Sequence, residues 1–321
     1  MALRTLLTDK LGIRHPVLLA PMGGTAGGAL AAAVSGAGGL GILGGGYPEA
    51  DWLEREFAAA GNQRIGCGFI TWALATRPEA LDLALSHNPA ALMLSFGNAA
   101  PFIPRIRKTG TLLICQVQTL AQASAVLDQG ADIIVAQGTE AGGHGGRRST
   151  LPLVPAVVDM VARSGRAVPV AAAGGIADGR GLAAALMLGA DGVLMGSRFY
   201  AAEEALAAPA AKARVVAGTG DDTLRTHVFD IVRDRGWPKE YTGRALRNRF
   251  SEAWHGRETA LIEAAAGENP RYAAAAAAGD FDTAVVFAGE GIDLIHMVEP
   301  AGIILDRVVR EAEAALARRF V

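Results

Sequence analysis

The chain has 321 residues, of which 51% are hydrophobic and 19% are charged, and its formal net charge is −2. A chain of this length and composition buries a large core, so it is not intrinsically disordered, and it fits one barrel-sized domain or two ordinary domains. The near-neutral charge and the scattered Lys and Arg residues argue against nucleic acid or an acidic membrane surface as a partner.

The N-terminal part of the chain is apolar but does not have the pattern of a membrane or secretory segment. Residues 16–48 carry no charge, yet Pro16, Pro21 and several glycine clusters interrupt them, which a lipid-exposed helix tolerates poorly. No uninterrupted apolar stretch with a cleavage signal precedes them. Cys67 and Cys115 lie in different apolar strands without metal-ligand spacing, so we interpret them as core residues of a cytoplasmic protein.

Short apolar runs rich in Val, Ile and Leu alternate with helical patterns from the N-terminus onwards. The predicted strands are 17–20, 40–43, 65–69, 91–95, 111–116, 132–137, 168–173 and 191–196. The predicted helices between them are 29–37, 49–60, 77–87, 101–109, 119–129, 152–164 and 178–188. Strands that alternate with helices indicate a parallel sheet, because each crossover helix returns the chain to the same edge.

The number of these units favours a (β/α)₈ TIM barrel over an open, doubly wound sheet, which usually has fewer strands. About a hundred residues then separate the last strand from an amphipathic helix that starts after Pro300. We therefore predict a barrel formed by residues 1–204 and 296–321, with a small helical subdomain over 205–295. A lid over the active site or a homodimer contact are both reasonable roles for this insertion. Its Ala-rich stretch 273–278 is interpreted as helix without chemistry.

Two glycine-containing loops follow the seventh and eighth predicted strands, where such barrels commonly bind phosphate. Gly174 and Gly175 end the first strand, and Gly196 and Ser197 end the second. Glycine lets an anion approach the backbone amides, and the Ser197 hydroxyl adds a donor. Because both loops lie at the expected positions, we interpret their glycines as part of a phosphate-binding site rather than as residues of tight turns alone.

His144 lies in a glycine-rich loop, residues 137–146, at the end of the sixth predicted strand and therefore on the same rim as those two loops. No second His, Cys or carboxylate stands at ligand spacing, and no Ser lies in a G-x-S-x-G turn, so neither a metal site nor a hydrolase triad is expected. Glu140 either orients the loop or acts as a capping carboxylate. The remaining interpretation is that the imidazole of His144 acts as an acid or base beside a phosphorylated cofactor or substrate.

The sequence resembles the nitronate monooxygenase family, formerly called 2-nitropropane dioxygenases, which bind FMN in a TIM barrel. The strongest resemblance is in the segment 136–146, Ala-Gln-Gly-Thr-Glu-Ala-Gly-Gly-His-Gly-Gly. Further similar segments are 20–24, 37–41, 172–179 and 189–199. The resemblance covers the whole predicted barrel and, weakly, the C-terminal third.

The resemblance implies roles for individual residues. His144 matches the family's catalytic histidine, which takes the proton next to the nitro group of a neutral nitroalkane or orients a preformed nitronate. The nitronate then passes an electron to FMN, O₂ is consumed, and a carbonyl compound and nitrite are released. The matching flavin-contact positions are Pro21, Met22, Gly23, Gln116, Gln137, Gly142 and Gly143, and the phosphate-binding positions are Gly174, Gly175, Leu194, Met195, Gly196 and Ser197.

The sequence also departs from the family pattern at one flavin-contact position. The family usually has Gly-Val-Asn after the third strand, with the Asn touching the flavin, whereas this chain has Gly66, Cys67 and Gly68. One flavin contact at Gly68 is therefore lost or remade. The aromatic residues that shape the substrate pocket in some members have no assignable position in this sequence.

Three alternatives stay open at this point. FMN-dependent enoyl-acyl-carrier-protein reductases and flavin NADH:quinone reductases have a related His loop, although Gln137 and the segment 279–284 favour the nitronate branch. The third alternative is a flavin-binding module without turnover, in which the change at Gly68 has loosened the cofactor.

Overall fold

The computed structural model describes residues 3–47 and 49–318, and it contains a barrel of eight parallel strands. The barrel strands are β1 (Val17–Leu19), β2 (Ile42–Gly46), β3 (Gly66–Ile70), β4 (Ala91–Ser95), β5 (Leu112–Val117), β6 (Ile133–Gln137), β8 (Val170–Ala173) and β9 (Gly192–Met195). They follow the order β1-β9-β8-β6-β5-β4-β3-β2. A parallel bridge between Leu18 and Leu40 joins the two ends of the sheet. The predicted TIM barrel is thus confirmed.

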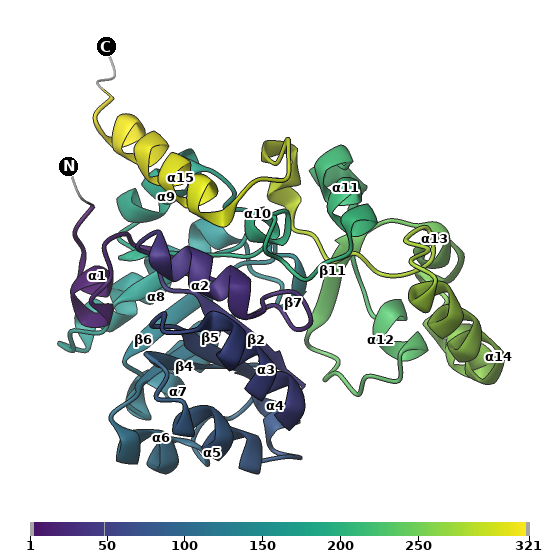
Figure 1. Ribbon diagram of the computed structural model, residues 1–321, viewed down its shortest axis with the longest axis horizontal. Helices are drawn as coiled ribbons and strands as arrows, with labels where there is room; N and C mark the ends of the chain where they lie inside the picture. The colour runs from purple at the N-terminus through teal and green to yellow at the C-terminus, as the bar shows by residue number, and fades with distance from the viewer. Residues whose placement is uncertain (1–2, 48, 319–321) are drawn as a thin grey trace.

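Helices surround this barrel, as Figure 1 shows. They are α2 (Gly28–Gly36), α3 (Ala50–Ala60), α4 (Thr71–Leu74), α5 (Glu79–Ser86), α6 (Ile103–Thr109), α7 (Leu120–Asp128), α8 (Thr150–Arg163), α9 (Gly179–Met187), α10 (Ser197–Tyr200) and α15 (Ala301–Leu316). The C-terminal helix α15 packs on α9 and α2 and therefore takes the place of the eighth barrel helix. It starts directly after Pro300, as the sequence predicts.

The core has two layers because successive residues of a strand point to opposite faces. Leu18 points into the barrel interior, while its neighbours Val17 and Leu19 pack against the surrounding helices. The short helix α1 (Leu6–Leu11) adds Leu7 and Leu11 to the interior cluster and so fills one end of the barrel. Burial on both faces explains why the strands read as continuous apolar runs.

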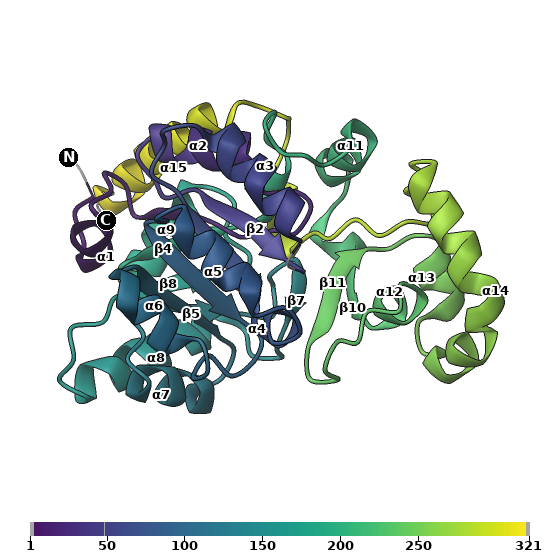
Figure 2. The same cartoon turned by 60° about the horizontal axis from the view of Figure 1, so that its bottom comes forward.

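The segment between α10 and α15 lies largely beside the barrel, and its colour runs from green to yellow in Figures 1 and 2. It contains the helices α11 (Pro209–Ala217), α12 (Val228–Val232), α13 (Arg249–Trp254) and α14 (Glu258–Ala277), the 3₁₀ turns Gly220–Asp222 and Glu290–Leu294, and the strands β10 (Thr223–Thr226) and β11 (Thr242–Leu246). These two strands form a second sheet with β7 (Gly143–Gly145), in the order β10-β11-β7. The insertion is thus joined to the barrel by a strand that contains His144.

The strand and helix predictions within the barrel overlap the observed elements, with one clear difference at β2. The sequence places this strand over 40–43, whereas it extends to Gly46. Glycine has a low preference for strands, so the three glycines at 44–46 give no strand signal in the sequence. Position 44 requires glycine because a Cβ atom there would lie 2.1 Å from the carbonyl oxygen of Met22.

The predicted helical insertion contains helices as expected, together with the strand pair β10–β11, which the sequence analysis does not predict. Each of these short strands has an Arg at its centre, so neither shows an apolar strand pattern. The domain limits at 204/205 and 295/296 stay a prediction, and residues 1–2, 48 and 319–321 lie outside the described part of the chain. Within that part, no helix combines the length and apolar character needed to cross a bilayer.

Candidate active site

A cavity of about 500 Å³ opens at the carboxyl ends of the barrel strands, where the strands meet the inserted segment. The barrel contributes glycine-rich loops after β1, β2, β8 and β9, and the insertion contributes aromatic and basic side chains. A cavity of this size fits a small organic cofactor or a substrate.

The strand that contains His144 pairs with the insertion. Its strand β7 pairs antiparallel with β11, and His144 faces Gly243 in this pairing. A Cβ atom on Gly243 would lie 3.5 Å from His144 Nε2 and 3.0 Å from Phe287 Cε1, so glycine allows the two rings to approach this strand. The sequence predicts a loop at His144, because a Gly-His-Gly strand has no apolar pattern.

The imidazole of His144 contacts two residues of the insertion. Its Nε2 lies 2.9 Å from Asp230 Oδ2, and the side chains of His144 and Asp230 are only 8% and 7% exposed. The indole of Trp237 stacks on the imidazole, with a centroid distance of 3.4 Å and an interplanar angle of 2°. The ring is therefore fixed by a carboxylate at its edge and an aromatic ring on its face.

Burial sets the charge state of His144. Desolvation lowers its pKa below the usual value of 6.5, and the hydrogen bond and charge of Asp230 oppose this shift only in part. Arg233 and Arg225 lower the pKa further. The imidazole is therefore neutral at pH 7, which is the form that a general base requires.

Arginines from the inserted strands hold the His loop in place. Arg225 of β10 donates through Nε to the carbonyl oxygen of Thr139 at 3.0 Å and through Nη2 to that of Ala141 at 3.3 Å. Arg244 of β11 donates to the same Thr139 oxygen at 3.0 Å and pairs with Glu290 at 2.8 Å. Burial lowers the pKa of Arg225 to about 10, so it stays charged at neutral pH.

Glu140 caps the following helix. Its carboxylate accepts hydrogen bonds from the backbone N–H and the hydroxyl of Thr150, the first residue of α8, at 2.9 and 2.7 Å. Of the two roles left open for Glu140, the structure shows capping. The same bonds tie the His loop to the start of α8.

Three glycine-containing segments meet at the predicted phosphate end of the cavity. Gly174 and Gly175 have positive φ angles of 110° and 70°, which a side chain would strain. A Cβ atom on Gly291 would lie 2.7 Å from the carbonyl oxygen of Gly175, so these backbones touch. The backbone N–H of Gly289 donates to Ser197 Oγ at 2.9 Å. The arrangement brings backbone and hydroxyl groups to one small region, as an anion site requires.

A chain of glutamine amides lies between the barrel wall and the His loop. Gln137 Nε2 donates to the carbonyl oxygen of His144 at 3.1 Å, and its Oε1 accepts from Gln116 and Gln118 at 3.1 and 2.9 Å. Gln137 thus positions the backbone of His144, a role that the sequence does not reveal. Gln116 also lines the cavity together with Ser95, whose buried hydroxyl has no hydrogen-bond partner among the described residues.

The structure brings most of the predicted site residues to this one cavity. Those that line it are Pro21, Met22, Gly23, Gln116, Gln137, Gly142, Gly143, His144, Gly174, Gly175, Leu194, Gly196 and Ser197. Gly68 and Met195 are not among the described residues that line it; Met195 is fully buried in the core. The side chain of Met195 packs in the cluster between the strands and the helices, so a ligand contact at this position stays a prediction.

The ring of Pro21 explains why residue 68 is glycine. A Cβ atom on Gly68 would lie 2.4 Å from Cβ and 2.6 Å from Cγ of Pro21. The Asn that the family usually has here would therefore overlap with the proline ring. The proline ring fills the space above Gly68. On the neighbouring strand β4, Ser95 pairs in register with Ile70, and its buried hydroxyl has no partner among the described residues.

We expect Gly68→Asn to lower the free energy of unfolding by about 1–3 kcal/mol, the usual cost of overpacking. The double variant Gly68→Asn/Pro21→Gly should recover much of this loss, because it removes the atoms that Asn would meet. Urea denaturation of both variants measures the effect. A double variant no more stable than Gly68→Asn would show that Pro21 is not the obstacle.

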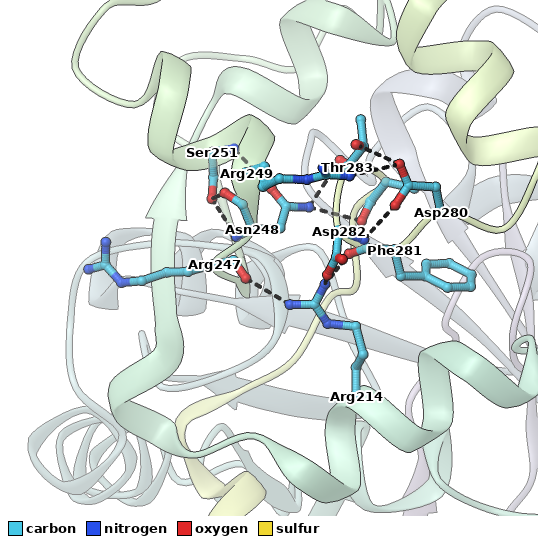
Figure 3. Close-up of polar contacts among 10 residues, drawn as sticks. Arg214, Arg247, Asn248, Arg249, Ser251, Asp280, Phe281, Asp282 and Thr283 are labelled. Atoms are coloured by element: carbon cyan, nitrogen blue, oxygen red, sulfur yellow. Dashed lines mark hydrogen bonds and ion pairs between the residues drawn. The ribbon is translucent and has the colours of Figure 1, made fainter.

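A polar cluster, shown in Figure 3, anchors the segment that leads to Phe287 and Gly289. Arg214 of α11 donates to Asp282 Oδ1 at 2.9 Å. Asn248 caps α13 with its Oδ1 and donates through Nδ2 to the carbonyl oxygens of Thr283 and Ala284, both at 3.0 Å. The segment 279–284, which favours the nitronate branch in the sequence, thus has a structural role.

Several residues around His144 and in the cavity wall have no signal in the sequence. Asp230 lies 86 residues after His144, and Trp237 follows in the next loop. The aromatic wall also includes Tyr47, whose hydroxyl accepts a hydrogen bond from Trp237 Nε1 at 2.6 Å, together with Phe96 and Phe287. Short-range patterns do not report such contacts, since they depend on how the insertion folds back over the barrel.

Comparison with known proteins identifies the family. The family model described as nitronate monooxygenase matches residues 4–62 and 75–311. The chain belongs to the nitronate monooxygenase family. A nitronate monooxygenase of Neurospora crassa is 33% identical over an alignment of 350 residues, which covers 95% of this chain and 91% of that relative.

Two solved structures of similar proteins share the architecture of this family member. FabK from Thermotoga maritima is 32% identical with a TM-score of 0.82, and the match covers 98% of this chain and 97% of that one. A nitroalkane oxidase from Streptomyces ansochromogenes is 29% identical with a TM-score of 0.81, covering 97% and 99%. The chain is thus an enzyme of a flavin-dependent monooxygenase family.

Proposed function

We propose that this enzyme uses FMN and O₂ to oxidise alkyl nitronates or nitroalkanes to carbonyl compounds and nitrite, with His144 as the general base. The observation that carries the proposal is the position of a buried, neutral imidazole in the same cavity as the glycine-rich loops after β8 and β9. The family resemblance adds the reaction type.

The residues of the cavity fit FMN. At one end of the cavity the backbone of Gly291 touches that of Gly175, and the backbone N–H of Gly289 donates to Ser197 Oγ, so these segments lie close enough together to surround a phosphate group. Ser95 Oγ and the Gln116 amide offer polar groups along the wall. When bound, FMN would supply the electron acceptor that transfers electrons from the substrate to O₂.

The remaining wall suits an anionic or nitro-bearing substrate. The aromatic rings of Trp237 and Phe287 make the surroundings of His144 apolar, which excludes water. Arg235 and Arg233 also line the cavity, and Arg233 in addition pairs with Asp230; among the described lining residues, the acidic one is Glu49. A nitronate carries a negative charge, so the two guanidinium groups favour its binding.

The likeness to FabK supports a second candidate, an FMN-dependent enoyl-acyl-carrier-protein reductase or NADH:quinone reductase. In either reaction the electrons come from a reduced nicotinamide rather than from a nitronate. A third candidate, a flavin-binding module without turnover, would bind FMN but process neither type of substrate.

One set of measurements separates these candidates. We expect the purified protein to be yellow, to lose this absorbance when ethylnitronate is added without oxygen, and to consume O₂ and release nitrite without NADH. Rapid bleaching by NADH, followed by reduction of a quinone or an enoyl thioester and no nitrite, would instead establish the reductase. Yellow protein that neither reagent bleaches would establish the module without turnover.

A further inference from the structure

The two ring nitrogens of His144 have different surroundings. Nε2 lies 2.9 Å from Asp230 Oδ2, and both side chains are almost fully buried. An ionised carboxylate can only accept a hydrogen bond. The proton of the neutral imidazole therefore lies on Nε2, which leaves the lone pair on Nδ1.

Asp230 is itself fixed at both oxygens. Its Oδ1 pairs with Arg233 Nη2 at 3.0 Å, while Oδ2 faces His144. Arg233 is held further by its Nε, which donates to the carbonyl oxygen of Phe229 at 2.7 Å. The orientation of the carboxylate is thus determined within α12 and the residue that follows it, and not by His144 alone.

Aromatic contacts prevent the imidazole from turning over. Trp237 covers one face of the ring at a centroid distance of 3.4 Å. Phe287 lies 5.5 Å away at an angle of 56°. Trp237 is fixed in turn by the hydrogen bond from its Nε1 to Tyr47 on the opposite wall of the cavity. A ring flip, which would replace Nε2 by Cε1 beside Asp230, would have to displace Trp237.

We propose that Asp230 is a positioning residue that holds the proton on His144 Nε2, so that Nδ1 is the atom that takes the substrate proton. The inference rests on the proposed function, in which His144 is the base. The proton on the carbon next to the nitro group moves to Nδ1, and the electron pair of that C–H bond stays on the nitronate. The imidazolium that forms is stabilised by the Asp230 carboxylate.

The tautomer can be measured without any substrate, so this test does not depend on the proposed reaction. In ¹⁵N NMR spectra of the FMN-loaded protein at pH 7, His144 should show a protonated Nε2 and an unprotonated Nδ1, assigned by the signals missing in His144→Asn. In Asp230→Asn the amide can donate to Nε2, so the proton should shift to Nδ1. A wild-type spectrum with the proton on Nδ1 would overturn the inference.

Kinetics provide the second readout. Asp230→Asn should lower kcat for nitroethane by about 10²–10⁴-fold, while Asp230→Glu, which keeps a carboxylate, should retain more activity. The matched control is Asp234→Asn in the next loop, because Asp234 is exposed and has a φ of 50° that Asn also adopts. An Asp230→Asn enzyme with unchanged kcat would contradict the positioning role.

The pH profile separates positioning from a merely structural effect. The charged groups that act on His144 are Asp230 and Arg233 at α12 and Arg225 on β10. Asp230 favours the imidazolium, so its removal lowers the pKa of His144 and moves the acid limb of kcat/KM to lower pH. An acid limb that stays in place would mean that Asp230 does not interact with the base.

Discussion

His144→Asn should turn over nitroethane about 10²–10⁴ times more slowly than the wild-type enzyme while keeping its yellow colour. Asn has no group that takes a proton near neutral pH, so the neutral nitroalkane is no longer deprotonated in the cavity. The flavin should remain, because the phosphate cradle around Gly175 and Ser197 does not depend on the imidazole. Oxygen uptake and nitrite release measure the rate, and visible absorbance measures the flavin content.

A preformed nitronate gives the internal comparison for this prediction. Ethylnitronate needs no deprotonation, so its turnover should fall much less than that of nitroethane. His87→Asn is the matched control, because His87 stacks on Phe57 and bonds to Glu54 outside the cavity. If His144→Asn slows both substrates equally, the histidine does not act as the base.

Arg225→Met should lower the free energy of unfolding by about 3 kcal/mol and also impair turnover. Arg225 donates to the carbonyl oxygens of Thr139, Ala141 and Thr242, and Met removes all three hydrogen bonds in a partly buried region. The Thr139 oxygen keeps a second side-chain donor, Arg244. The loop that carries His144 then loses its main support from β10. Urea denaturation measures the free energy of unfolding, and nitroethane turnover reports whether the loop still positions His144.

Two further variants test the cause of this effect. Arg225→Lys keeps the charge but not the planar set of donors, so it should recover only part of the stability. Arg271→Met is the surface control, since Arg271 is 79% exposed and pairs with Glu268; its urea midpoint should stay almost unchanged. If Arg225→Lys is as stable as the wild type, charge alone explains the role of Arg225.

The sequence by itself determined the barrel and its rim. Buried parallel strands appear in the sequence as continuous apolar runs, and the helices between them have apolar residues at helical spacing. Both patterns are local, so they can be recognised from the sequence alone. Because strand ends meet at one rim of a barrel, the positions of Gly174, Gly175, Ser197 and His144 along the chain placed them at one cavity. The same local motifs identified the family.

Only the tertiary structure decided what surrounds His144. Asp230, Trp237 and Arg225 come from an insertion whose two short strands have an Arg at their centre, so no periodic pattern predicts them. Their approach to the imidazole depends on the pairing of β10 with β11 and of β11 with β7, which joins segments far apart in the sequence. The close approach of Pro21 to the Cβ position of residue 68 depends on the packing of two separate segments. Neither segment alone predicts such a contact.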